Sequence, residues 1–159
     1  MAENEFIAGY SYEEWENLEK EFLRDYKNST MYNKSFRELI SEILEGETYM
    51  SFADKTNLSP NMLYRLKKQV DEKDPPQRST IVTVCIAYKI DFLMMQALLH
   101  SLGLDINRFN KRDYAYTFLL TRCRDKTLDQ CNDILKQLGI PQTYWLGHHA
   151  KGKKKTKKK

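Results

Sequence analysis

Signals that begin and end helices recur along this chain of 159 residues. Residues 11–14, 35–38 and 127–130 have the pattern of a capping box, in which a hydroxyl residue precedes a carboxylate or amide residue by three places. Asp91 can act as a further N-cap. Glycines able to adopt the left-handed conformation stand where helices should end, at Gly46, Gly103 and Gly139. No strand-like alternation of useful length appears, so the sequence predicts an all-α fold.

The predicted helices combine these signals with apolar residues at helical spacing. They are expected near residues 11–27, 35–45, 49–56, 60–70, 79–89, 92–102, 111–123 and 128–138. The first is amphipathic, with a stripe made of Tyr12, Trp15, Leu18, Phe22 and Tyr26. We expect this stripe to cover the protein's own core, which is the commoner use of such a helix. Contact with a second chain is the alternative.

Composition limits the class of protein. With 41% hydrophobic residues the chain can bury one core of ordinary size. Its longest apolar run, Ile81 to Tyr88, is far shorter than the roughly 20 residues that cross a bilayer. The acidic N-terminus lacks the pattern of a secretory signal. Three cysteines without a CxxC pair favour reduced thiols, so we expect a cytoplasmic protein that does not enter a membrane.

The net charge of +4 is unevenly distributed. Residues 151–159 contain seven lysines, which leaves the rest of the chain with 19 basic and 22 acidic residues. Residues 1–34 hold four basic and eight acidic residues, while residues 35–150 are nearly neutral, with 15 and 14. We expect the tail from 147 to 159 to be disordered by repulsion and able to bind any polyanion.

The segment from Thr48 to Lys67 has the pattern of two short helices joined by a tight turn. Asn57 suits the turn because asparagine tolerates positive φ, and Ser59 is placed to cap the second helix ahead of a first-turn proline, Pro60. The residues expected to bury the two helices are Phe52, Ala53, Leu63 and Leu66.

These residues give the chain a resemblance to a known family. Residues 35–102 resemble the Cro/C1-type, or XRE-family, helix-turn-helix domain of phage repressors and bacterial regulators. The family pattern falls, without insertion, on Thr48, Tyr49, Phe52-Ala53, Asn57, Ser59-Pro60 and Leu63. Tyr49 stands where the family commonly has a glutamine, and Asn57 where it has a turn glycine.

The resemblance implies a five-helix lambda-repressor-like domain, here with an additional N-terminal helix and a C-terminal helical hairpin. It divides the chain into an acidic segment at 1–34, the helix-turn-helix domain at 35–102, a hairpin extension at 103–146 and the lysine-rich tail at 147–159. The hairpin's apolar face is expected to extend the core or to form a dimer surface.

The resemblance also implies a function, which is sequence-specific binding of double-stranded DNA by a homodimeric transcriptional regulator, expected to be a repressor. Helix 60–70 would enter the major groove. Base-reading residues would be Asn61, Met62 and Arg65. Phosphates would be contacted by Tyr49, Ser59, Tyr64, Lys67 and Lys68.

The acidic N-terminal segment and the near-neutral body favour a second hypothesis. In this alternative the fold is a protein-interaction module, such as an antitoxin or a phage or mobile-element inhibitor, that holds a partner through helix 11–27 or hairpin 111–138. The sequence contains no motif typical of an enzyme, a cofactor site or a metal site, so we expect none of these.

Overall fold

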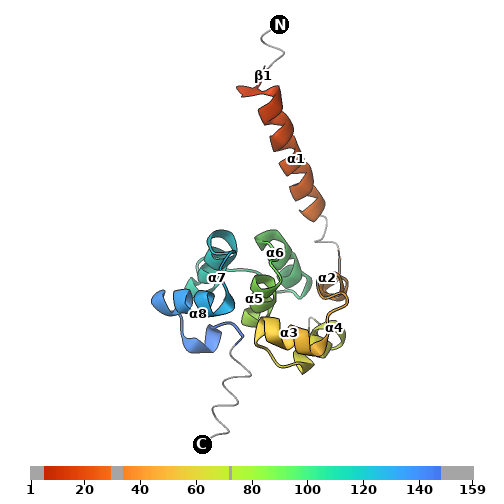
Figure 1. The fold of residues 1–159 in the computed structure, drawn as a ribbon, viewed down its shortest axis with the longest axis vertical. Coiled ribbons are helices and arrows are strands. Elements are labelled where there is room, and N and C mark those ends of the chain that lie inside the picture. Colours follow the sequence, from red (N-terminus) through yellow and green to blue (C-terminus); the bar gives the residue numbers. More distant parts are fainter. Residues whose placement is uncertain (1–5, 30–33, 72, 148–159) are drawn as a thin grey trace, which may run out of the picture.

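The computed structural model describes residues 6–29, 34–71 and 73–147, and its α-helices account for most of them (Figure 1). In chain order they are α1 (Tyr12–Ser29), α2 (Phe36–Ile43), α3 (Tyr49–Thr56), α4 (Asn61–Lys68), α5 (Arg78–Ala87), α6 (Phe92–Ser101), α7 (Lys111–Arg122) and α8 (Leu128–Gln137). A 3-10 turn, η3 (Gln142–Tyr144), follows. The prediction of a mainly helical fold is confirmed. The predicted disordered tail lies outside the described residues, apart from Gly147.

A short antiparallel hairpin precedes α1 and was not predicted. Its strands are β1 (Phe6–Ile7) and β2 (Tyr10–Ser11), with Phe6 paired to Ser11 and Ile7 to Tyr10. The turn between them places Ala8 and Gly9 at positive φ. Two residues per strand are too few to show period-two alternation, which explains why the sequence pattern missed the hairpin.

The helix caps predicted at residues 35–38, 91 and 127–130 are confirmed. Ser35 and Glu38 exchange the two hydrogen bonds of a capping box, as do Thr127 and Gln130. The Asp91 carboxylate accepts the Met94 N–H at 2.9 Å. Gly46, Gly103 and Gly139 all have positive φ, as expected for residues that end helices.

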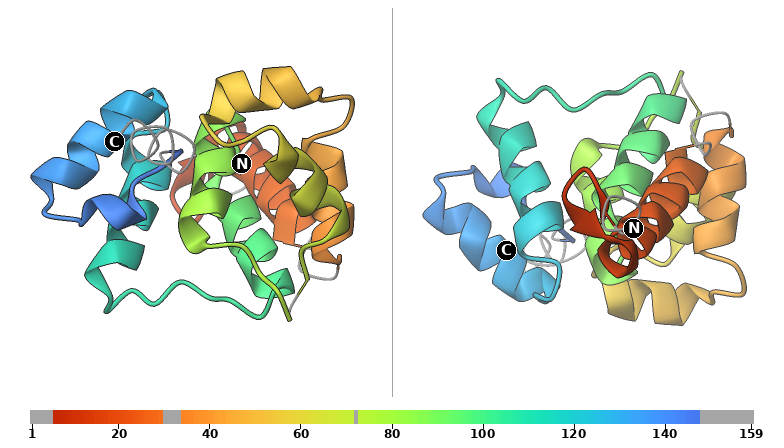
Figure 2. Two further views of the ribbon diagram at one scale, coloured as in Figure 1. Left: turned by 90° about the horizontal axis from the view of Figure 1, so that it is seen from below. Right: turned by 90° about the horizontal axis from the view of Figure 1, so that it is seen from above.

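Helix α5 is the centre of the fold. All its residues from Ser79 to Ile86 are buried, and it contacts α3, α6, α7 and α8 (Figure 2). Its apolar run is therefore that of a helix surrounded by others. The buried side chains form one hydrophobic cluster that extends from Phe36 to Leu146, so α7 and α8 share their core with α2 to α6. Among the described helices, none combines the length and apolar character required to cross a membrane.

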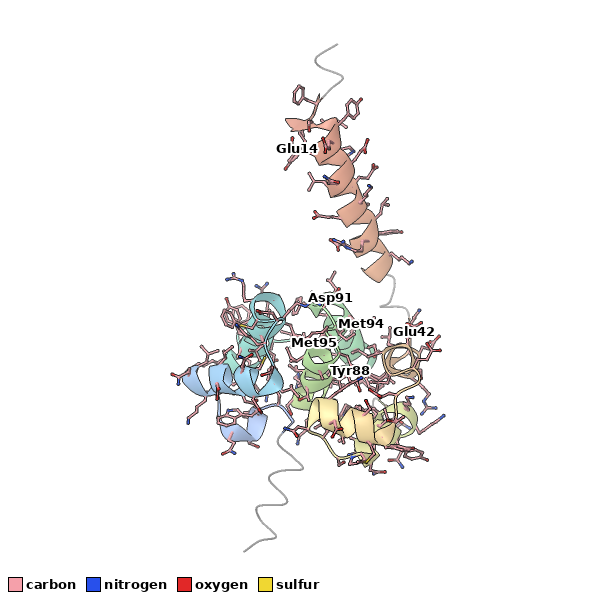
Figure 3. All side chains as sticks on the ribbon, viewed as in Figure 1. Glu14, Glu42, Tyr88, Asp91, Met94 and Met95 are labelled. Atoms are coloured by element: carbon pink, nitrogen blue, oxygen red, sulfur yellow. The ribbon has the colours of Figure 1, made fainter. Side chains whose placement is uncertain are left out.

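Helix α1 projects from the body formed by the other helices (Figure 1). It contacts the hairpin and α6, and its labelled residue Glu14 lies towards the end that points away from the body (Figure 3). Tyr12, Phe22 and Tyr26 are exposed, whereas Trp15 and Leu18 are half-buried. The expectation that this stripe covers the protein's own core is therefore wrong for most of its residues.

Candidate nucleic-acid interface

The predicted pair of short helices is present as α3 and α4, which contact each other. Thr48 caps α3 by accepting the Ser51 N–H at 3.1 Å. Asn57 ends α3 in the left-handed conformation with φ of 60°, and its N–H donates to the Ala53 carbonyl at 2.9 Å. The prediction that Asn57 accommodates positive φ at this turn is confirmed.

The turn is fixed from within by Thr56, which is fully buried. Its hydroxyl donates to the Phe52 carbonyl at 2.7 Å and accepts the Leu58 N–H at 3.2 Å. One side chain thus hydrogen-bonds a carbonyl within α3 and an N–H of the following turn. A buried amide left without a partner would cost free energy, so Thr56 stabilises this turn conformation.

Gly147 packs against the same turn, although it lies 90 residues further along the chain than Asn57. It is buried, has φ of 65°, and donates its N–H to the Thr83 hydroxyl at 3.1 Å. A Cβ atom at this position would lie 2.4 Å from the Thr56 carbonyl oxygen and 2.9 Å from the Asn57 Cβ. The segment after α8 therefore packs directly against the α3–α4 turn.

The preceding residue, Leu146, is anchored by α8. Its carbonyl accepts from the Asn132 side-chain amide at 2.9 Å, and its N–H donates to the Asn132 Oδ1 at 2.7 Å. Because Leu146 is buried and held at both backbone groups, α8 determines where Gly147 meets the turn. The C-terminal hairpin thereby contributes to the geometry of the helix pair.

The predicted N-cap of α4 requires a correction. The N-cap is Pro60, with helical dihedral angles of −57° and −34° and no side-chain hydrogen bond, rather than Ser59. The carbonyls of Ser59 and Pro60 accept the N–H groups of Met62 and Leu63, at 3.0 and 3.1 Å. These tighter bonds form the first turn, and the fixed φ of proline suits that conformation.

A polar clamp attaches α3 to the end of α5. The Glu47 side chain, only 9% exposed, accepts hydrogen bonds from the Tyr88 hydroxyl and from Lys55 Nζ, the latter at 3.1 Å. Lys55 Nζ also lies 5.2 Å from the centre of the Tyr88 ring. Figure 3 shows Tyr88 on the α5 side of this junction. The clamp joins residues before α3, within it and after α5.

The contacts within this clamp shift the pKa values of Glu47 and Tyr88. The hydrogen bond from Tyr88 lowers the pKa of Glu47 from 4.5 to about 2. Burial, together with the same bond, raises the pKa of the Tyr88 phenol. Glu47 is therefore ionised, and Tyr88 protonated, throughout the pH range in which most proteins are folded.

The predicted DNA-contact residues differ in how much of each side chain is exposed to solvent. Leu63 and Leu66 are buried, as expected, and hold α4 on the core. Asn61, Ser59, Tyr64, Tyr49 and Lys68 are exposed, while Arg65 and Lys67 are half-buried. Met62 is half-buried and packs against the hydrophobic core, so only part of its side chain is accessible to a thymine methyl. This weakens the hypothesis for Met62 as a base-reading residue.

The helix pair is more basic than the chain around it. Residues 49–68 contain four basic residues and one acidic residue, and α4 contains three basic residues and no acidic one. Arg37 from α2 donates to the Lys68 carbonyl at 2.9 Å, which satisfies the C-terminal end of α4. In the loop beyond, the Asp71 carboxylate accepts the N–H groups of Lys73 and Asp74. That carboxylate therefore has a local structural role.

The sequence did not identify Thr56, Glu47, Tyr88 or Gly147 as parts of the site. Thr56 directly precedes the turn residue, and a threonine near a helix end is a recognisable signal for a local hydrogen bond. The other three act across long stretches of chain, and no spacing rule relates them to the motif.

The three cysteines, Cys85, Cys123 and Cys131, are all buried and free, as predicted. Burial raises the pKa of the Cys131 thiol to about 11, so it stays protonated at neutral pH. In the part of the chain that the structure describes, no cluster of three metal-ligating side chains is found. His100 lies on the surface with its Nδ1 3.5 Å from the Asp105 carboxylate.

Comparison with known protein families, with curated proteins and with solved structures finds no match to this chain.

Proposed function

We propose that this protein is a sequence-specific DNA-binding transcriptional regulator in which α4 enters the major groove. The observation that carries the proposal is the construction of the α3–α4 pair. Buried leucines hold α4 on the core, Asn57 and Thr56 define the angle at which it leaves α3, and its remaining face is polar and basic. A short, rigidly held helix with such a face is suited to a major groove.

Within α4, two side chains can read base edges. Arg65 can donate two hydrogen bonds to guanine O6 and N7, and Asn61 can pair with adenine N6 and N7. Asn61 occupies the first helical position, where recognition helices commonly meet bases. Met62 has a smaller role because it packs against the core.

Residues near Asn61 and Arg65 would contact the DNA phosphates. Tyr49 begins α3 with 51% of its surface exposed, so its hydroxyl is free to reach a phosphate instead of packing inside. Ser59, Tyr64, Lys67 and Lys68 extend the same set along the turn and α4. Phosphate neutralisation by a few such groups, with help from the lysine-rich tail, would supply affinity without sequence preference.

The test is selection of bound sequences from a random pool of double-stranded DNA, performed with the full chain. The proposal expects one enriched motif, and Arg65→Ala should relax it at one position by about 1–3 kcal/mol. Arg122→Ala is the matched control, because it removes the same charge from the exposed end of α7. Ending the chain at Ala150 should lower affinity and salt dependence but leave the motif unchanged. Absence of any enriched motif at moderate salt would overturn the proposal.

The exposed aromatic face of α1 favours a second candidate function, that of a protein-interaction module. In that case the chain would copurify in fixed stoichiometry with a different protein. Substitution of Phe22 would abolish this complex, whereas Arg65→Ala would leave it intact.

A further inference from the structure

A recessed pocket of about 210 Å³ lies between the N-terminal ends of α5 and α7, with η3 as its third wall. Two arginines line it, Arg78 from the first position of α5 and Arg112 from the second position of α7. The other lining residues are polar or aromatic, namely Gln77, Ser79, Tyr116, Thr143 and Tyr144. We propose that this pocket binds the phosphate group of a small phosphate monoester.

Both arginines stand where a positive charge is unfavourable unless an anion is near. The N-terminal end of a helix carries a partial positive charge, which a cation opposes and an anion relieves. Arg78 opens α5, whose first turn contains no acidic residue and receives no side-chain hydrogen bond from the N-cap. Arg112 lies in the first turn of α7, where Asp113 is the acidic residue. Two guanidinium groups and one carboxylate leave a net charge of +1 at this wall of the pocket.

Asp113 holds the two arginines without using all of their donors. Its buried carboxylate accepts from Arg112 Nε at 3.1 Å and from the Asn107 N–H at 2.9 Å. Arg78 donates from Nη2 to the Asp105 carbonyl at 3.2 Å. Its Nε is fully buried, lies 3.9 Å from the Asp113 carboxylate, and has no hydrogen-bond partner in the described part of the chain. A buried donor without a partner is costly, so this arginine favours a further acceptor.

The side chains around the arginines are fixed before any ligand binds. The central carbon of the Arg112 guanidinium lies 4.8 Å from the centre of the Tyr144 ring, a cation–π contact that restricts its rotation. The Tyr144 carbonyl accepts from the Tyr116 hydroxyl at 2.7 Å, which attaches η3 to α7. The Ser79 hydroxyl, in a residue only 4% exposed, makes a long hydrogen bond of 3.4 Å to the Gln77 side chain and can donate to a ligand instead. Groups held in this way lose less entropy on binding.

Size and donor chemistry favour a terminal phosphate over other anions. Two guanidinium groups with neighbouring hydroxyls offer more donors than a planar carboxylate accepts, whereas a phosphate monoester presents three oxygens. The pocket is smaller than the roughly 300 Å³ at which cavities enclose a whole drug-sized ligand, so it suits the phosphate end of a molecule. A phosphodiester of nucleic acid carries a substituent on each side of its phosphorus, which suits a recessed pocket less well.

The experiment is an NMR titration of the full chain with inorganic phosphate, methyl phosphate and dimethyl phosphate in separate arms, at constant ionic strength. The first two should shift the backbone amide signals of residues 77–79, 112 and 143–144 until they saturate, with one dissociation constant. Dimethyl phosphate has the diester chemistry of a nucleic-acid backbone. It should bind at least about tenfold more weakly, because it offers fewer charged oxygens.

Substitutions connect this binding to the pocket. Arg112→Gln should weaken phosphate binding about tenfold to a hundredfold, because it removes hydrogen bonds to a charged group. Thr143→Val, at an exposed position of η3, should weaken it about two- to tenfold while leaving the contacts of Asp113 intact. Arg108→Gln is the matched control, since it makes the same charge change at an exposed residue outside the pocket. Circular dichroism verifies that each variant remains folded.

Several results would overturn the proposal. These are shifts confined to the lysine-rich tail, no saturable shift at the pocket residues, equal losses of affinity in Arg112→Gln and Arg108→Gln, or unchanged affinity in both Arg112→Gln and Thr143→Val. Equal binding of methyl and dimethyl phosphate would overturn the choice of a monoester. The proposal does not depend on DNA reading, because phosphate affinity is measured at the pocket and DNA selection depends on α4.

Discussion

Replacement of Gly147 by alanine tests the claim that the C-terminal segment supports the α3–α4 turn. The added Cβ would lie 2.4 Å from the Thr56 carbonyl oxygen and 2.9 Å from the Asn57 Cβ. The first neighbour is backbone and cannot rotate away. Either the turn or the segment held by Asn132 must therefore move.

Gly147→Ala is expected to reduce folding stability in two ways, and the same substitution at Gly103 separates the two contributions. A residue with a side chain at φ of 65° costs about 1–2 kcal/mol by itself. The steric overlap adds about 1–3 kcal/mol, the usual cost of overpacking a filled interior. Gly103 has φ of 72° but nothing within 4 Å of an added Cβ, so Gly103→Ala should show the first cost alone.

The assay is equilibrium unfolding in urea at 25 °C with the wild type and both variants. Gly147→Ala should lower the free energy of unfolding by about 1–3 kcal/mol more than Gly103→Ala. It should also weaken binding to a DNA motif selected by the wild type, because the shifted turn changes the angle of α4. Equal losses of stability in the two variants would refute the proposed contact.

Two further predictions concern the polar groups around α3. The folded-state pKa of Glu47 is depressed, so the stability it contributes is present above pH 4.5 and is lost as the pH falls towards 2. The difference in unfolding free energy between the wild type and Glu47→Gln should therefore shrink over that range, and a constant difference would show that the clamp is not charged. Thr56→Val should cost about 1–3 kcal/mol in urea unfolding, because it leaves the buried Leu58 N–H without a partner. Thr121→Val, which removes only a bond to the Thr117 carbonyl at a more exposed position, should cost clearly less, and similar costs would argue against the role given to Thr56.

Local structure was accessible from the sequence because its causes are local. A capping box needs only a hydroxyl and a carboxylate or amide three residues apart, and Ser35 with Glu38 forms one as predicted. The turn at Asn57 followed from the backbone freedom of asparagine. The start of α4 was misplaced by one residue, because backbone carbonyls rather than the Ser59 side chain complete its first turn.

The tertiary contacts could not be predicted from the sequence, because the residues that form them lie far apart in the chain. Periodicity showed that α1 has an apolar stripe but could not show what covers it, and the structure leaves Phe22 and Tyr26 exposed. The spacing rules that singled out Met62 as an outward residue also could not detect its partial packing on the core. Likewise, nothing in the motif relates Gly147 to a turn 90 residues earlier.

The most direct test of DNA reading by α4 is a residue-by-residue map of backbone amide NMR shifts of the full chain as double-stranded DNA is added. The largest shifts should fall at residues 49–51 and 59–68. The amide signals of residues 111–138 should change little. Shifts in the lysine-rich tail do not count as evidence for DNA reading by α4, because such a tail can bind any polyanion. Shifts confined to that tail, or centred on α1 or α7, would contradict the account.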